Sequence, residues 1–211
     1  MATKATQRRS ASYFLSSGDL YILAEGVTFR VHRYFFIRDS ELFAKKLRPE
    51  DGYSEQKPVI LETSPEKLEK LLWVFYNPNY CDYTAPREDW ESILELADGW
   101  SFPEAKALAL RTLDTLDMEL VDRIVLYRKF HASQDVLADM LADLCAQDAI
   151  LTPDEVQKLG WATVGKLLYA RELLRGQAEA QGITVCPLPD TVTSDEIWGT
   201  VVDLFRLEVT V

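Results

Sequence analysis

The spacing of apolar residues changes near His32, and this change most constrains how the chain can fold. From Asp19 to Val31, apolar residues alternate on either side of Glu25-Gly26, a pattern typical of a β-hairpin. After His32 the apolar residues recur at helical spacing over most of the remaining chain. We therefore expect an α+β protein with a small strand-containing start followed by an array of helices.

Start and stop signals divide the later part of the chain into helices. Ser64-Pro65-Glu66 combines a serine N-cap with proline at the first helical position, and Thr152-Pro153-Asp154-Glu155 is a capping box. Residues 177–193 form a break rich in glycine and proline. We expect the helix before this break to stop ahead of Gly176, and Ser194 to cap a last amphipathic helix.

Charge is distributed unevenly along the chain. Residues 1–50 carry 9 basic and 5 acidic side chains, and the rest carries 14 and 29, which gives +4 and −15. Together with the breaks, this predicts four regions. They are a flexible N-terminal arm at 1–16, a first domain at 17–116, a helical extension at 117–176, and a linker with a C-terminal amphipathic helix at 177–211.

The overall composition excludes several classes of function. A net charge of −11 argues against direct binding of nucleic acid or of an anionic membrane. Two histidines and three cysteines, far apart in sequence, cannot supply a zinc site of the usual spacing, and we expect no metal. No apolar run approaches the ~20 residues that span a bilayer. We expect a soluble intracellular protein, cytoplasmic and/or nuclear.

Motifs of common enzymes are absent from the sequence. We find no G-x-S-x-G, no P-loop and no G-x-G-x-x-G, and no nucleophile and base stand out as a pair. We therefore predict no catalytic residues, no cofactor and no small-molecule substrate. An enzyme without a recognisable motif is kept as the less favoured alternative.

The segment from Asp19 to Leu47 resembles the start of a BTB/POZ domain. That family has an acidic residue at the start of its first strand, then F-x-x-H-[KR], then Ser-x-x-F one helix later. The matching residues here are Asp19, Phe29, His32, Arg33, Ser40, Phe43 and Leu47. A short apolar strand at Pro58–Leu61, a helix ending in Trp73-Val74-Phe75-Tyr76 and two further helices at Pro86–Trp100 and Glu104–Leu116 follow in the family's order. The resemblance therefore covers residues 17–116.

The resemblance implies both a fold and a class of function. The implied fold is a small mixed sheet capped by helices, here with a C-terminal helical extension. Blocks such as LLWVFYNP and DRIVLYRKF are similar to those of short BTB proteins abundant in mushroom-forming fungi. BTB/POZ domains are non-enzymatic platforms that self-associate or recruit partners, so the expected partners are proteins: a second copy in a homodimer, or a cullin-type scaffold. A cullin-3 ligase adaptor and a transcriptional regulator are the alternative roles.

Two pairs of residues are candidate interaction sites under this resemblance. Asp19 and Arg33 match the charged pair that lines the pocket of POZ transcription regulators, which implies a partner or dimer pocket. The alternative is an acid at a strand start and an exposed arginine, because surface ion pairs contribute only ~0–1 kcal/mol. Tyr53 and Glu55 match the hydrophobic-x-Glu motif of cullin-3 adaptors. For His32 we expect a structural role at the junction of strand and helix.

Tryptophans on helical stripes are expected to lie in the core. Among them, Trp161 is predicted to share an inward stripe with Val164 and Leu168. Trp198 is the exception, because it lies beside the apolar stripe of the last helix. That helix is predicted to dock, either on its own chain or on a partner. Its candidate docking residues are Ile197, Trp198, Val201 and Phe205.

Overall fold

The hairpin expected between Asp19 and Val31 is present as strands β2 (Leu20–Ala24) and β3 (Val27–Val31). The two strands pair antiparallel, with Leu20 opposite Val31 and Ala24 opposite Val27. Glu25 and Gly26 form the turn with φ angles of 40° and 82°. Positive φ at both positions is what a two-residue type I′ turn requires, which explains the glycine at the second position.

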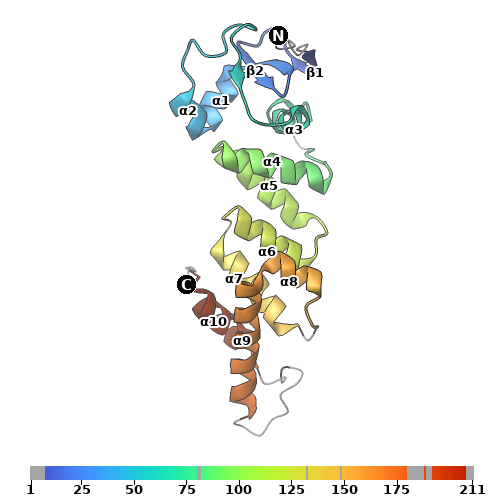
Figure 1. The fold of residues 1–211 in the computed structure, drawn as a ribbon, viewed down its shortest axis with the longest axis vertical. Coiled ribbons are helices and arrows are strands. Elements are labelled where there is room, and N and C mark those ends of the chain that lie inside the picture. Colours follow the sequence, from blue (N-terminus) through green and yellow to red (C-terminus); the bar gives the residue numbers. More distant parts are fainter. Residues whose placement is uncertain are drawn as a thin grey trace, which may run out of the picture. The chain divides into compact units, whose positions relative to one another are not determined.

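The computed structural model describes residues 8–79, 82–131, 133–147, 149–179, 188 and 192–207. The chain divides into two compact units, Met1–Leu116 (unit 1) and Asp117–Val211 (unit 2). Unit 1 contains all the described strands, and unit 2 is helical where it is described (Figure 1). The expected α+β fold, with a small mixed sheet and a C-terminal helical region, is therefore confirmed.

The expectation of a flexible arm over residues 1–16 is wrong for Arg8–Phe14, which form strand β1. This strand runs parallel to β3, with an irregular register before Phe14. The Leu15 N–H donates to the Arg30 carbonyl at 2.8 Å. This pairing is favoured because, without β1, the backbone N–H and C=O groups along one edge of β3 would lack hydrogen-bond partners in the sheet. Residues 1–7 lie outside the described part of the chain.

A fourth strand completes the sheet of unit 1. Strand β4 (Val59–Ile60) lies within the predicted segment Pro58–Leu61 and pairs parallel with β2. The strand order is β1-β3-β2-β4, so β1 and β4 form the two edges. The mixture of parallel and antiparallel pairs follows from the connections: a two-residue turn joins β2 to β3, whereas β4 returns after two helices.

The described part of unit 1 also contains five helices, and aromatic residues form much of their packing. Phe36 packs edge-on against Phe43 and Phe102, with ring centroids 5.1 and 5.9 Å apart. All three side chains are buried. The helices are α1 (Arg33–Asp39), α2 (Glu41–Lys46), α3 (Pro65–Tyr76), α4 (Arg87–Gly99) and α5 (Pro103–Thr115).

In its described residues, unit 2 contains five further helices around a second apolar core. The guanidinium of Arg171 donates to the carbonyls of Leu144 and Cys145 at 2.8 and 3.0 Å, which satisfies carbonyls at the end of a neighbouring helix. The last helix packs on the second and fourth helices of the unit (Figure 1). The helices are α6 (Leu120–Lys129), α7 (Gln134–Ala146), α8 (Pro153–Leu159), α9 (Trp161–Glu179) and α10 (Ser194–Phe205).

Two predicted helix limits in unit 2 are wrong. Helix α9 continues past Gly176 to Glu179, because one glycine costs only ~1 kcal/mol and does not by itself end a helix. The N-cap of α10 is Thr193 and not Ser194. Thr193 lies three residues before Glu196, and this spacing allows the reciprocal bonds of a capping box. The predicted linker lies mostly outside the described residues.

The predicted inward stripe of α9 is also wrong. Trp161 and Leu168 are 81% and 53% exposed. Val164 is buried as expected, but the buried face continues through Leu167 and Ala170. The reason is that α9 carries apolar residues on both of its faces, so periodicity alone does not identify the face that packs inward.

Candidate functional site

His32 lies where β3 passes into α1, and its contacts are local. The Tyr76 hydroxyl accepts from the His32 backbone N–H at 2.8 Å and lies 3.0 Å from ring Nδ1. The Ser17 hydroxyl lies 3.1 Å from Nε2. Burial raises the pKa of Tyr76 above its ordinary value. These contacts hold the strand, the start of α1 and the end of α3 together, which is the arrangement expected for a structural histidine.

The remaining residues of the family pattern lie in or beside the core. Phe29 and Phe43 are buried. The buried Ser40 hydroxyl accepts from the Phe43 N–H at 3.0 Å and donates to the Trp100 carbonyl at 2.6 Å. Leu47 follows α2, is half-buried, and donates its N–H to the Phe43 carbonyl. These residues therefore have structural roles within the domain, and other residues form its exposed surface.

Asp19 and Arg33 are brought together, but their side chains do not form the predicted ion pair. The Asp19 carboxylate accepts from the backbone N–H of Arg33 at 2.8 Å, at the first residue of α1. An acid at a helix N-terminus satisfies a backbone donor there and interacts favourably with the helix dipole. Asp19 therefore holds the first backbone N–H of α1, and the role of Asp19 and Arg33 in a partner or dimer pocket stays a prediction.

The guanidinium of Arg33 holds the loop between α2 and β4. It donates to the carbonyl of Arg48 at 2.9 Å and to that of Asp51. Nearby, the Gly52 carbonyl accepts from the Tyr21 N–H at 2.7 Å. Gly52 has φ of +63°, and a Cβ there would lie 2.7 Å from Leu20 Cδ1. Sequence reasoning missed this anchoring, because bonds to backbone carbonyls leave no side-chain pattern to detect.

A groove of about 590 Å³ opens beside this loop. Residues of α2, the loop, β4 and the end of α4 line it, and most of its wall is apolar. Tyr53 lies on this wall and is 57% exposed. Lys46, Glu50 and Lys57 contribute ionic groups. The apolar part of the wall includes Leu42, Leu47, Pro58, Leu61 and Trp100.

The two predicted cullin contacts, Tyr53 and Glu55, have different surroundings in the structure. Tyr53 lines the groove, whereas both oxygens of Glu55 accept from the Arg9 guanidinium of β1 at 2.8 Å. The bond and charge of Arg9 hold the pKa of Glu55 below its ordinary value. Glu55 therefore has an intramolecular partner, and a protein partner that recognises it must accommodate or displace Arg9.

A second exposed apolar surface lies on α1. Tyr34 is 61% exposed and Ile37 is 43% exposed. The Arg38 guanidinium lies 4.9 Å from the centre of the Tyr34 ring, a cation–π contact at the same surface. The sequence did not single out these residues, because α1 is apolar on nearly all sides and its inward face is ambiguous.

The C-terminal helix docks within its own unit. Ile197 and Val201 are buried against the core of unit 2. The Trp198 indole N–H donates to the Asp139 carboxylate of α7 at 2.8 Å. On the other side, the Lys166 ammonium of α9 lies 4.9 Å from the centre of the Phe205 ring. All four candidate docking residues thus pack on or beside α7 and α9.

Within the described ranges, no group of three or more histidine, cysteine, aspartate or glutamate side chains could hold a metal ion. None of the helices in the same ranges is long and apolar enough to cross a membrane.

The fold of unit 1 agrees with a comparison against protein-family models. The model described as BTB/POZ domain matches residues 12–116. A search of curated proteins found no match. BTB/POZ domains are protein–protein interaction modules. The match covers the whole described sheet except the first residues of β1, together with the helices that pack on it. The chain therefore belongs to the BTB/POZ domain family.

Proposed function

We propose that this protein is a non-enzymatic interaction module whose BTB/POZ domain recruits a partner protein through the groove beside Tyr53. The observation that carries this proposal is the exposed Tyr53 on an apolar wall next to a loop held by Arg33. Partly exposed aromatic residues beside apolar pockets are frequent anchors of protein interfaces. The anchored loop presents this side chain at little additional cost in conformational entropy.

The chemistry of the groove indicates what the partner presents. An apolar side chain from the partner would fill the space between Leu47 and Leu61, next to Tyr53. Lys46 and Glu50 provide charges of both signs for polar contacts around it. A cullin-type scaffold is the favoured partner, because Tyr53 and Glu55 lie in the loop where cullin-3 adaptors carry their contact motif. A corepressor of a transcriptional regulator is the alternative.

The test compares two tyrosines that are similarly exposed in the same domain. Tyr53→Ala should weaken binding of a purified cullin-3 N-terminal domain at least tenfold, as for a central anchor residue, whereas Tyr34→Ala should not. Titration calorimetry measures both. Affinity purification from the native host, with the same variants, then identifies the partners that depend on Tyr53.

Each outcome of this test has a definite meaning. Loss of cullin binding in Tyr53→Ala alone supports the adaptor role. Loss of a different protein in Tyr53→Ala alone supports the groove but replaces the cullin by that partner. If Tyr53→Ala retains every partner of the unaltered protein, the groove is not the recruitment site and the proposal fails.

Self-association through α1 is a second candidate function, favoured by the exposed Tyr34 and Ile37. Burying this apolar face against a second copy would remove it from water. Light scattering at low micromolar concentration should then show a dimer whose share of the protein falls in the double variant Tyr34→Glu/Ile37→Glu. Equal masses for the two proteins would contradict a role of α1 in assembly.

A further inference from the structure

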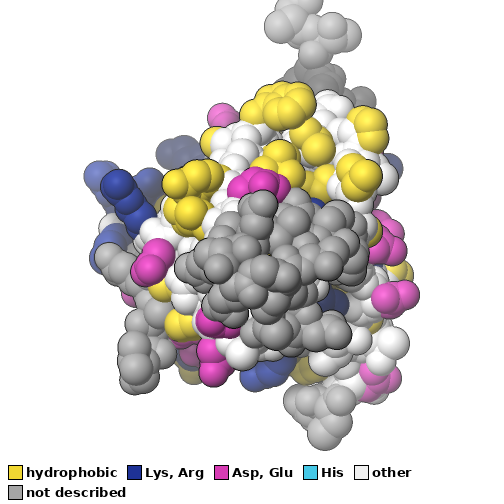
Figure 2. Space-filling view, turned by 90° about the horizontal axis from the view of Figure 1, so that it is seen from below, with side chains coloured by type: hydrophobic (Ala, Val, Ile, Leu, Met, Phe, Trp, Pro, Cys, Tyr) yellow, Lys and Arg dark blue, Asp and Glu magenta, His cyan; other side chains and the backbone are white. Residues whose placement is uncertain are grey.

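Helix α9 carries apolar residues on the face that points away from the core of unit 2. Its inner face is buried through Val164, Leu167, Ala170 and Leu174. On the opposite side, Trp161 is 81% exposed and Tyr169 is 57% exposed. Figure 2, which views the chain from below Figure 1, shows hydrophobic side chains gathered on part of the surface. A helix that is apolar all round is normally buried all round, so the outer face of α9 lacks a partner among the residues that the structure describes.

The outer face has the form of a ridge. Trp161, Gly165, Tyr169 and Leu173 follow one another at intervals of four residues and define what we call the α9 ridge. Leu168, 53% exposed, lies beside it. Apart from its chain neighbours and the backbone of its own helix, no atom lies within 4 Å of the position that a Cβ at Gly165 would occupy. The ridge therefore has bulky residues at its ends and a notch near its centre.

The exposed area suits an interface better than a free surface. Aromatic side chains bury roughly 150–250 Å² each, so Trp161, Leu168, Tyr169 and Leu173 together expose several hundred Å². Patches of about 300–600 Å² on monomers are often functional. A standard interface takes about 800 Å² from each partner, and these four side chains supply a substantial part of that area.

We propose that the α9 ridge binds the α9 ridge of a second copy of this chain across a two-fold axis. Rows of side chains at intervals of four residues interdigitate in the commonest class of helix packing, at about −50°. An axis midway between Gly165 and Tyr169 places Tyr169 of each copy over the notch of the other. Crossed helices are closest at their centre and diverge outward, where Trp161 and Leu173 fill the wider gap.

The charges near the ridge are compatible with a second copy. The chain carries a net charge of −11, so two copies repel each other in general. The α9 ridge itself carries no charge, and the ionic residues beside it, Lys166 and Glu172, have opposite signs. The ridge thus offers a locally balanced surface on an acidic protein. This proposal concerns unit 2 and is independent of the groove in the BTB/POZ domain.

The experiment measures mass in a protein whose α1 face is disabled. In the full chain carrying Tyr34→Glu/Ile37→Glu, sedimentation equilibrium up to about 100 μM should still show a monomer–dimer equilibrium. Adding Trp161→Glu should raise the dissociation constant at least tenfold. Ile150→Glu is the matched control, because Ile150 is 91% exposed but lies outside α9, and it should leave the equilibrium unchanged.

A second variant tests the notch itself. A Cβ at position 165 would point into open space, and leucine favours helix formation more than glycine does, so unit 2 of Gly165→Leu should stay folded by circular dichroism. It fills the space into which Tyr169 of the other copy inserts, and should weaken the dimer at least tenfold. The proposal would be overturned if the protein carrying only Tyr34→Glu/Ile37→Glu is a monomer at every concentration. It would also be overturned if neither Trp161→Glu nor Gly165→Leu weakens the dimer of that protein.

Discussion

Ser40 is a single residue that connects three parts of the BTB/POZ domain. It ends α1, caps α2 through its bond with the Phe43 N–H, and reaches the Trp100 carbonyl after α4. Its side chain is buried, so water does not replace these bonds if they are lost. One hydroxyl therefore joins segments sixty residues apart in the sequence.

Ser40→Ala should lower the free energy of unfolding by about 2–3 kcal/mol, because it removes a helix cap and leaves a carbonyl without its bond. Ser64→Ala is the control. Ser64 caps α3 through one bond to the Lys67 N–H and is half-buried, so its loss should cost about 1 kcal/mol. Urea denaturation measures both variants, and equal losses would show that the bond to Trp100 contributes nothing.

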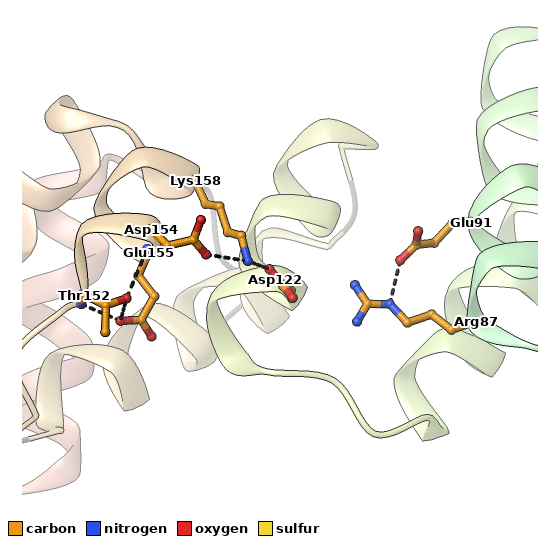
Figure 3. A network of polar contacts seen from close by, with 7 residues as sticks. All are labelled: Arg87, Glu91, Asp122, Thr152, Asp154, Glu155 and Lys158. Carbon is orange, nitrogen blue, oxygen red and sulfur yellow. Dashed lines mark hydrogen bonds and ion pairs between the residues drawn. The ribbon is translucent and has the colours of Figure 1, made fainter.

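At the scale of elements, α8 and α10 begin with the same device. The backbone N–H of each N-cap threonine donates to the glutamate three residues later, at 2.6 Å for Thr152 and 2.8 Å for Thr193. These bonds hold the pKa values of Glu155 and Glu196 below their ordinary range. In α8, bonds to Asp122 and Asp154 raise the pKa of Lys158 to about 12 (Figure 3).

The capping boxes predict how stability depends on pH. The carboxyl pKa values are lower in the folded state, so their stabilisation is present above the ordinary value of 4.5 and is lost as pH falls through the lowered values. Glu155→Gln/Glu196→Gln should therefore lose less stability between about pH 6 and pH 3 than the unaltered protein. Urea midpoints at the two pH values measure this, and parallel losses would contradict it.

Strand β1 shows why an element can be missed in a sequence. Arg8–Phe14 contains two arginines, two serines and an alanine and lacks a clear alternation of apolar residues, which is typical of a tail. Its stability in the sheet comes from bonds to β3 and from the Arg9–Glu55 pair. Both kinds of contact are made with residues distant in sequence, so the local strand propensity of Arg8–Phe14 does not predict them.

At the scale of the whole molecule, the chain combines two cores. The aromatic core of unit 1 and the aliphatic core of unit 2 belong to units that divide between Leu116 and Asp117. The end of the first domain was predicted at the same residue. We propose that the two units are separate domains, with the BTB/POZ domain recruiting partners and unit 2 contributing the α9 ridge. Membership of a narrower fungal group stays a prediction.

The sequence by itself determined the family, the order of most elements and the hairpin turn. These follow from local signals: apolar periodicity, capping residues and the spacing of a family pattern. Only the tertiary structure decided that Arg33 holds a loop, that Glu55 bonds Arg9, and which face of α9 is buried. The physical reason is that these contacts join residues far apart in the chain, and their partners are set by packing rather than by neighbouring residues.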